Sequence, residues 1–313
     1  MEINMIKRLF IFAAYDKDNI IDDTLLYYLQ ELSKLGDIVF TMDNDTPKSE
    51  MDKLSHIPNI LHATAIRHNE YDFGSYKRGY IWAKDNKILN KYDWIYFVND
   101  SVYGPLWNIE HILQKLENQD AGMIGLYENV SENIPQHIQS WFVGFKNSVV
   151  KKDFFYKFIN NIHHNDDKWN IILKYEVGFS RLIIQNGYKF FALYKDDYKN
   201  DCLLYEKPQK ILEYGIPFIK KSALCNICDF KFLMPYCDDD FIQKIKNHAS
   251  RYNLSINQNI STDKYKKCFR LTFLSIPILT VRCRKNTDYK VFVFDKIPIL
   301  KIVTQKVKDN ETV

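Results

Sequence analysis

The stretch that decides the fold is Asp93 to Leu106, DWIYFVNDSVYGPL. Its first part, DWIYFV, is an almost continuous apolar run, which is typical of a strand buried on both faces of a parallel sheet. Two small polar residues, Asn99 and Asp100, follow at the point where this strand should end. Ligands of open α/β sheets bind beyond the carboxyl ends of the strands, so the stretch predicts a buried strand and a binding site together.

The residues nearer the N-terminus predict the same class of fold. Arg8 to Ala14 is another apolar run, and Thr24 to Leu35 has the leucine spacing of a helix that Gly36 ends. A short strand is expected at Asp37 to Met42. An order of strand, helix and strand indicates a parallel sheet that is covered by helices.

The residues after this stretch continue the pattern as far as Lys221. An amphipathic helix is expected at Tyr175 to Gln185. Three further strands are expected, at Gly122–Leu126, Ser140–Phe145 and Tyr188–Leu193. We therefore expect an α/β domain over residues 1–221, followed by a smaller extension over residues 222–313 that is basic and partly β.

The composition is that of a soluble globular protein, with 46% hydrophobic and 26% charged residues. The charge is unevenly distributed. The segment from Lys264 to Val313 holds 12 Lys and Arg against 4 Asp and Glu, a net charge of +8, and the remainder holds 31 against 35, a net charge of −4. A basic segment suits anionic lipid, an anionic glycan or nucleic acid. No recognisable nucleic-acid module accompanies it, so we expect no nucleic-acid partner.

The sequence shows no signal peptide and no stretch close to the roughly 18 to 20 apolar residues that span a bilayer. We therefore expect a cytoplasmic protein. Two interpretations of the basic extension stay open. In the first it contacts the inner face of the plasma membrane or a lipid-linked acceptor, and in the second it packs an apolar face against the main body.

The six cysteines do not form the disulfide framework of a small secreted protein. Cys225 and Cys228 make a CxxC pair with Cys237 nearby, so a zinc site is conceivable. No second CxxC or HxxxH completes such a site, and we expect reduced, partly buried thiols.

FVNDS, Phe97 to Ser101, is the first candidate site. A carboxylate at the end of a strand can hold a divalent cation between two phosphates. We expect Asp100 to bind Mg²⁺ or Mn²⁺ and, with Asn99 and Ser101, to hold the diphosphate of a sugar donor. The alternative is a turn or a helix N-cap, for which the same residue types are favourable.

HNEYDFGSYKRGY, His68 to Tyr80, is the second candidate site. Lys77 and Arg78 could meet phosphate, and Asp72 could accept a hydrogen bond from a ribose or a base. The alternative is an ordinary solvated loop and the start of a helix.

Two further segments supply candidates on the acceptor side. HIQSWFVGF places His137, Gln139 and Trp141 around the start of a strand, where an aromatic face can stack on a sugar. Core packing is the alternative for Trp141. Glu176 opens the expected helix, so the positive end of the helix dipole should keep it ionised, and a capping role is the alternative.

Two denser carboxylate clusters, Asp196–Asp197 and Asp238–Asp240, follow no convincing buried strand. We expect both in solvated loops. The sequence has no GxSxG, Walker loop, HExxH or GxGxxG motif, which argues against the enzyme classes that those motifs mark.

Four motifs occur in a specific order: N-x-x-DFGSYKRG, a buried strand ending in NDS-x-x-GPL, Q-S-W-F, and Y-E-x-G-x-S-x-L. Together they resemble the rhamnan synthesis protein F family, which is related to the GT-A glycosyltransferases. The resemblance runs from about Arg8 to Lys221. The segments FVNDSVYGPL, HIQSWFVGF and GIPFIKK carry most of it.

The resemblance implies a GT-A-like fold, with a Rossmann-like nucleotide-binding half joined to an acceptor half. It implies transfer of a sugar, often a deoxyhexose such as rhamnose, from a nucleotide-linked donor to a growing surface polysaccharide. FVNDS is similar in position to the Asp-x-Asp metal motif of that fold, although it offers one carboxylate, Asp100. YEVGFSRLIIQNGYKF is similar to a helix of the family 2 inverting enzymes, which places Glu176 where their catalytic base lies.

We therefore expect an inverting glycosyltransferase that uses a dTDP-, UDP- or GDP-linked sugar. The expected acceptor is a lipid-linked or oligosaccharide precursor of capsule, O-antigen or lipopolysaccharide. Glu176 is the expected general base. Three alternatives stay open: a retaining glycosyltransferase, a nucleotidyltransferase, and a catalytically inactive glycan-binding or assembly protein on the same fold.

Overall fold

The computed structural model describes residues 6–130, 134–196, 203–226 and 230–252, together with four strands between residues 266 and 303. The chain forms two compact units, residues 1–256 and 257–313. We expected the boundary after residue 221, and the structure places it after residue 256. The reason is that the helix at Asp239–Arg251 belongs to the first unit. Its residues Phe241, Ile242 and Ile245 pack in an apolar cluster with Tyr103 and Leu106.

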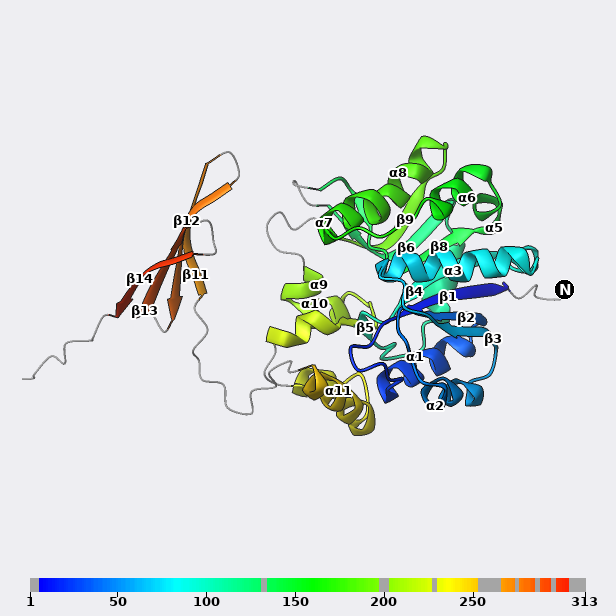
Figure 1. Ribbon diagram of the computed structural model, residues 1–313, viewed down its shortest axis with the longest axis horizontal. Coiled ribbons are helices and arrows are strands. Elements are labelled where there is room, and N and C mark those ends of the chain that lie inside the picture. Colours follow the sequence, from blue (N-terminus) through cyan, green and yellow to red (C-terminus); the bar gives the residue numbers. More distant parts are fainter. Residues whose placement is uncertain are drawn as a thin grey trace, which may run out of the picture. The chain divides into compact units, whose positions relative to one another are not determined.

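The first unit alternates strands and helices along most of its length (Figure 1). Its strands are β1 (Arg8–Ala14), β2 (Asp37–Met42), β3 (Ile60–Ala65), β4 (Trp94–Asn99), β5 (Val102–Tyr103), β6 (Met123–Asn129), β7 (His137–Ile138), β8 (Phe142–Lys146), β9 (Phe190–Asp196) and β10 (Ile219–Lys220). Its helices are α1 (Asp23–Ser33), α2 (Lys48–Met51), α3 (Tyr71–Asp85), α4 (Glu110–Glu117), α5 (Asn147–Val150), α6 (Asp153–Asn160), α7 (Lys168–Ile171), α8 (Val177–Gln185), α9 (Leu203–Glu206), α10 (Pro208–Glu213) and α11 (Asp239–Arg251).

One mixed sheet forms the centre of this unit, with strand order β3-β2-β1-β4-β8-β6-β7 and with β9 also paired to β6. β3, β2, β1 and β4 are parallel neighbours, whereas β8 runs antiparallel to β4 and β6. The chain proceeds from β1 through β2 to β3 on one side, and β4 lies on the other side of β1. The strand order therefore reverses between β1 and β4, which is where open α/β sheets bind ligands.

Alternate residues of the central strands face opposite layers of helices. Phe10 and Phe12 of β1 belong to an apolar cluster with α1 and α4, whereas Leu9 and Ile11 belong to a cluster with α3, α6 and α8. Both faces of the sheet are thus buried, which explains the unbroken apolar runs of β1 and β4. The expected α/β class, a mixed sheet flanked by helices, is confirmed.

The helix that contains Glu176 begins earlier than expected, at Lys168. α7 continues through one turn of π-helix, Ile172–Glu176, into α8. Glu176 therefore lies in the interior of a helical stretch, and the argument from a helix N-terminus was wrong. The overlooked signal is Asp167, whose carboxylate accepts from the Trp169 N–H at 2.8 Å and caps α7.

Among the described residues, Asp196 ends a strand and Asp238–Asp240 begin a helix, so the expectation of loops was wrong for them, whereas Asp238–Asp240 are exposed to solvent as expected. Asp196 is the buried last residue of β9, and its carboxylate accepts from the Tyr127 hydroxyl. Asp197 lies outside the described residues. Asp238 caps α11, because its carboxylate accepts from the Phe241 N–H at 2.8 Å.

Cys237 is a half-buried free thiol, and burial, followed by nearby aspartates, raises its pKa to about 11. Its sulfur therefore stays protonated at neutral pH. Cys228, the second cysteine of the conceivable zinc site, lies outside the described residues. The expectation of reduced thiols and the zinc alternative both stay predictions.

The second unit is an antiparallel sheet whose strands pair in sequence order. Its strands are β11 (Lys266–Phe273), β12 (Ile276–Arg284), β13 (Asp288–Val293) and β14 (Ile297–Val303). Neither unit, within the residues that the structure describes, has a helix with the length and hydrophobicity that crossing a membrane requires.

Candidate active site

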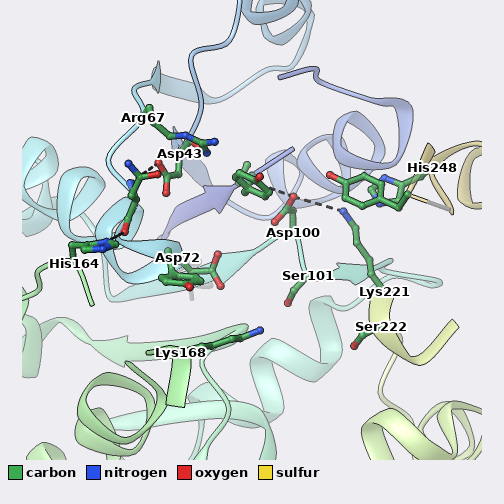
Figure 2. Close-up of a pocket in the computed structure, with 15 residues that line it drawn as sticks. Asp43, Arg67, Asp72, Asp100, Ser101, His164, Lys168, Lys221, Ser222 and His248 are labelled. Carbon is green, nitrogen blue, oxygen red and sulfur yellow. Dashed lines mark hydrogen bonds and ion pairs between the residues drawn. The ribbon is translucent and has the colours of Figure 1, made fainter. Parts of the chain in front are cut away.

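A cavity of about 720 Å³ opens beyond the carboxyl ends of the parallel strands, where the strand order reverses (Figure 2). The residues that follow the strands line it: Tyr15 after β1, Asp43 after β2, Arg67 after β3 and Asp100 after β4. The start of α7, residues 221 and 222, and the C-terminal end of α11 complete the wall. Segments far apart in the sequence thus meet at the position that FVNDS predicts.

Asp100 stands at the junction of β1 and β4. Its backbone N–H donates to the Ala13 carbonyl at 3.2 Å, and its carboxylate accepts from the Tyr15 N–H at 3.4 Å. The Lys221 ammonium lies 3.6 Å from the same carboxylate oxygen. Burial raises the pKa of Asp100, and the charge of Lys221 opposes that rise. Asp100 therefore faces the cavity as one half of an ion pair.

A short antiparallel pair of strands brings two lysines to this junction. β10 pairs with β5 directly after Ser101, and the Lys221 N–H donates to the Ser101 carbonyl at 3.0 Å. The Lys220 ammonium donates to the Ser101 hydroxyl at 2.8 Å and lies 5.4 Å from the centre of the Trp141 ring. The segment GIPFIKK thus delivers positive charge to the end of β4.

Asp72, in the first turn of α3, is another carboxyl group of the cavity. It accepts from the Asn99 side-chain amide at 2.7 Å, and the Asn99 carbonyl oxygen accepts from the Ser101 hydroxyl at 2.5 Å. Burial, followed by the charge of Asp100, raises the pKa of Asp72 to about 7. Asn99 therefore joins α3 to the end of β4 and fixes the orientation of the Asp72 carboxyl group.

The loop after β3 is fixed by Asp43. The buried Asp43 carboxylate accepts from the N–H groups of His68 at 2.6 Å and Asn69 at 3.0 Å. The Arg67 guanidinium donates to the Asp43 carbonyl at 2.8 Å and lies 5.3 Å from the centre of the Tyr15 ring. Asn69 has a φ of 58°, in the left-handed region, which asparagine adopts more readily than most residues. The exposed Arg67 is thereby held at the cavity.

α11 is fixed beside the end of β1 by a network of ion pairs. Arg251 lies 2.8 Å from Asp16 and 2.9 Å from Asp22, and His248 lies 2.6 Å from Asp22. Both aspartates belong to the loop between β1 and α1. This network holds two lining residues, His248 and Tyr252, at the wall of the cavity.

Lys77 and Arg78, which we expected at the donor phosphate, are not among the residues that line the cavity. The Lys77 ammonium donates to the Ile162 carbonyl at 2.7 Å, and Arg78 pairs with Glu70 at 2.5 Å. Only the first turn of α3 reaches the cavity, because a helix turns its later side chains to other faces. Lys77 instead joins α3 to the segment after α6, and Arg78 pairs with the residue that directly precedes α3.

The three residues that we expected on the acceptor side are buried. Trp141 is 2% exposed and packs against Phe142 and Phe218. The core-packing alternative therefore applies to Trp141, and stacking of its ring on a sugar was a wrong expectation. His137 and Gln139 are buried as well, and neither lines the cavity.

Glu176 is hydrogen-bonded to Ser140, in the segment before β8, and does not line the cavity. One of its carboxylate oxygens accepts from the Ser140 N–H at 2.7 Å and the Ser140 hydroxyl at 2.5 Å. The other lies 3.5 Å from His137 Nε2. Burial opposes both charges, but their attraction outweighs it and lowers the pKa of Glu176 while raising that of His137. The role of Glu176 as a base stays a prediction.

The family model of rhamnan synthesis protein F matches residues 22–294, which is most of the chain. The chain belongs to the rhamnan synthesis protein F family.

A curated relative of this family member is the uncharacterized protein y4gN of Sinorhizobium fredii (strain NBRC 101917 / NGR234), which is 24% identical over 187 residues. The match covers 59% of this chain and 48% of the relative, so the chain spans about half of the relative's length.

Three solved structures also resemble this rhamnan synthesis protein F family member. One is a glycosyltransferase involved in the glycosylation of the major capsid of PBCV-1, with 9% identity, 78% and 99% coverage of the two chains and a TM-score of 0.40. S. aureus TarS 1-349 has 12% identity, 82% and 76% coverage and a TM-score of 0.35. The S. cerevisiae mannosyltransferase Ktr4p has 9% identity, 53% and 62% coverage and a TM-score of 0.33.

The GT-A resemblance implies a divalent cation at Asp100, and the donor atoms of this family member do not fit one. Asp100 offers one carboxylate, which already lies 3.6 Å from the Lys221 ammonium. The side-chain oxygen of Asn99 already accepts a hydrogen bond from the Ser101 hydroxyl. No three His, Cys, Asp or Glu side chains of the described residues gather as metal ligands. The reaction therefore needs a cation other than a metal at this position, or further ligands, and the metal at Asp100 stays a prediction.

Sequence reasoning missed the cations that line the cavity, namely Arg67, Lys168 and Lys221. Lys221 had a signal, because GIPFIKK is one of the segments that carry the resemblance to the rhamnan synthesis protein F family. Arg67 had a partial signal, because it comes just after a strand of the parallel sheet, whereas Lys168 had none, because its position follows from contacts with distant segments.

Proposed function

We propose that this family member is a glycosyltransferase that moves a sugar from a nucleoside diphosphate sugar to a growing cell-surface polysaccharide. One observation carries the proposal: the cavity at the strand-order reversal is lined by the cations Arg67, Lys168 and Lys221. Its volume of about 720 Å³ falls within the range of small-molecule sites. A nucleoside diphosphate supplies the negative charge that such a lining attracts.

The proposed transfer is a single displacement that inverts the anomeric carbon. The acceptor hydroxyl oxygen attacks that carbon, and the bond from the carbon to the diphosphate oxygen breaks. The electron pair of this bond leaves with the nucleoside diphosphate. The acceptor proton passes to a base that lies across the sugar from the diphosphate.

Asp72 is the carboxyl group that the cavity offers for this proton. Asn99 orients it, and its pKa of about 7 lies near the value at which a general base is most effective at neutral pH. Glu176 is bonded to Ser140 and His137 instead. We therefore propose Asp72 as the base and Glu176 as a residue that positions the segment before β8.

The proposed donor is a dTDP-, UDP- or GDP-linked hexose or deoxyhexose, with rhamnose favoured by the description of the family. The proposed acceptor is a lipid-linked or oligosaccharide precursor of a capsule, an O-antigen or a lipopolysaccharide. We place the reaction in the cytoplasm, where nucleotide sugars are made available.

A panel of nucleotide sugars tests the proposal. The purified chain should release nucleoside diphosphate from one donor, slowly by hydrolysis and faster with a glycan acceptor. The anomeric configuration of the product, measured by NMR, separates inversion from retention. Binding of a glycan without turnover of any donor would contradict the proposal and support an inactive glycan-binding protein on the same fold.

A further inference from the structure

The diphosphate of a donor must be neutralised where it binds, and still more where it leaves. When the bond to the anomeric carbon breaks, its electron pair adds negative charge to the departing nucleoside diphosphate. A positive group within hydrogen-bond reach of that oxygen therefore stabilises the transition state more than the bound donor. A transferase site of this kind therefore needs a positive group beside the departing diphosphate oxygen.

Lys221 is the cation whose position is best fixed at the strand ends. Its backbone follows β10 and is bonded to Ser101, and its ammonium lies between the Asp100 carboxylate, at 3.6 Å, and the Tyr103 ring, at 5.7 Å from the ring centre. The Lys221 side chain is 18% exposed and that of Asp100 is 14% exposed. Figure 2 shows the Lys221 side chain directed at Asp100 from the wall of the cavity. Little side-chain freedom is therefore left for a ligand to remove.

Asp100 is poorly placed to hold a metal and well placed to hold Lys221. A metal at Asp100 would have to displace an ammonium that already neutralises the carboxylate, and no second free carboxylate lies beside it in FVNDS. Lys168, at the start of α7, lines the same cavity and adds a second positive charge.

We propose that Lys221, aimed by Asp100 and aided by Lys168, neutralises the donor diphosphate in place of a divalent cation. The proposal rests on the proposed function, because it concerns the leaving group of that reaction. The bond from the anomeric carbon to the diphosphate oxygen breaks, the electron pair stays on that oxygen, and the Lys221 ammonium donates a hydrogen bond to it. No proton transfer from Lys221 is required, because the acceptor proton has passed to the base.

A site that uses Lys221 and a site that uses a metal predict opposite effects of Asp100→Asn on the affinity for nucleotide. If Asp100 holds a metal, Asp100→Asn loses the metal and weakens nucleotide binding. If Asp100 only aims Lys221, Asp100→Asn removes a carboxylate that repels phosphate, so nucleotide binding tightens while turnover falls.

The test measures the Kd of UDP, dTDP and GDP for the full chain by calorimetry, in EDTA and in Mg²⁺ or Mn²⁺. We expect one nucleotide to bind equally well in EDTA and in metal. Lys221→Met should weaken its binding about 10- to 100-fold in both buffers, and Lys221→Arg should retain most of it. The matched control is Lys189→Met, which also removes a lysine from an ion pair. The Lys189–Asp120 pair is exposed and does not line the cavity, so the Kd should stay unchanged.

A double variant separates the charge of Lys221 from the exposure of Asp100. Lys221→Met with Asp100→Asn should still bind weakly, because the ammonium is absent, and wild-type affinity in the double variant would overturn the proposal. Loss of wild-type binding in EDTA, together with weaker binding by Asp100→Asn, would also overturn it and leave the proposed function standing. Absence of binding by every nucleotide in both buffers would overturn the nucleotide-sugar donor itself.

Discussion

At the scale of single residues, Asp72 and Glu176 acquire opposite properties from their surroundings. Asp72 is half-buried near Asp100, and its pKa rises to about 7, whereas Glu176 is hydrogen-bonded to Ser140 and lies beside His137, and its pKa falls. A base near neutral pKa can accept a proton from an alcohol and still be ionised in half of the molecules. A carboxylate with a lowered pKa is a weaker base, and a bonded one is better suited to fixing a loop.

Asp72→Asn should lower kcat/KM by about 10² to 10⁴, because the substitution keeps the shape and removes the basicity. In the wild type, kcat/KM should rise with pH through about 7 as Asp72 loses its proton. That rise should be absent in Asp72→Asn and present in Glu176→Gln. The measurement is the pH profile of the three proteins, and a rise that survives in Asp72→Asn but disappears in Glu176→Gln would restore Glu176 as the base.

The same shift in Asp72 has a consequence for stability. Its pKa is raised on folding, so the folded state binds the proton more tightly, and the free energy of unfolding falls as the pH rises from about 4 to about 7. Asp72→Asn removes this contribution. The variant should therefore be less sensitive to pH than the wild type over that range when unfolding by urea is measured.

The sequence could place Asp72, Asp100 and Ser101 at the cavity, because each follows a strand or opens a helix at one edge of the sheet. It could not show that Lys77 and Arg78 turn away, because that depends on the rotation of α3 against the sheet. Nor could it show the contacts of Glu176, whose partner Ser140 lies on another element.

At the scale of elements, the long buried strands were predictable and the short ones were not. β1 and β4 are recognisable in the sequence because both of their faces are buried and all of their residues except Arg8 and Asn99 are apolar. β5 and β10 have two residues each and pair across more than a hundred positions, so no local pattern marks them. Yet this pair carries Lys220 and Lys221 to the end of β4. The pairing of β5 with β10, which completes the site, was therefore not predictable from a local sequence pattern.

Arg251 of α11 pairs with three aspartates of the loop between β1 and α1, namely Asp16, Asp18 and Asp22. Arg251→Met leaves Asp16 without its cation, whereas Asp22 keeps its contact with His248, so we expect a loss of roughly 2 kcal/mol in the free energy of unfolding, between the surface and the fully buried cases. The variant should also bind nucleotide less well, because α11 carries the lining residues His248 and Tyr252. Urea unfolding and calorimetry measure the two effects, with the exposed Arg181→Met of α8 as the control.

The contribution of the Arg251–Asp16 ion pair to stability should depend on pH. Burial would raise the pKa of Asp16, but the hydrogen bond and the charge of the Arg251 guanidinium outweigh it and hold that pKa below its ordinary value. A lowered carboxyl pKa contributes stability that is present above the ordinary value, near about 3.9, and is lost as the pH falls through the lowered value. The difference between the wild type and Arg251→Met should therefore be full at pH 7 and shrink in strong acid. A difference that grows on acidification would contradict this account.

At the scale of the whole molecule, the charge that the sequence concentrates after Lys264 becomes a row in the second unit. The register pairs Lys267 with Arg282, Arg282 with Lys290, and Lys290 with Lys301, so the four positions share one face of the sheet. Neighbouring rows alternate between the two faces of a sheet. Like charges opposite each other destabilise a sheet, so such a row favours an anionic partner.

We propose an anionic membrane surface as the partner of this row of basic residues. Each Lys or Arg near an anionic leaflet contributes about 1 kcal/mol, and the effect is screened by salt. The full chain should therefore float with vesicles that contain acidic phospholipid, at low salt, and not with neutral vesicles. A chain that ends at Ile256 should fail to float with either, and so should a full chain with glutamine at the four row positions. The charge-matched control replaces four exposed lysines of the first unit, Lys34, Lys48, Lys151 and Lys189, with glutamine and should float as the wild type does. If the row variant floats equally with the wild type, the row does not meet the membrane, and packing of the extension against the main body becomes the better account of its apolar strands.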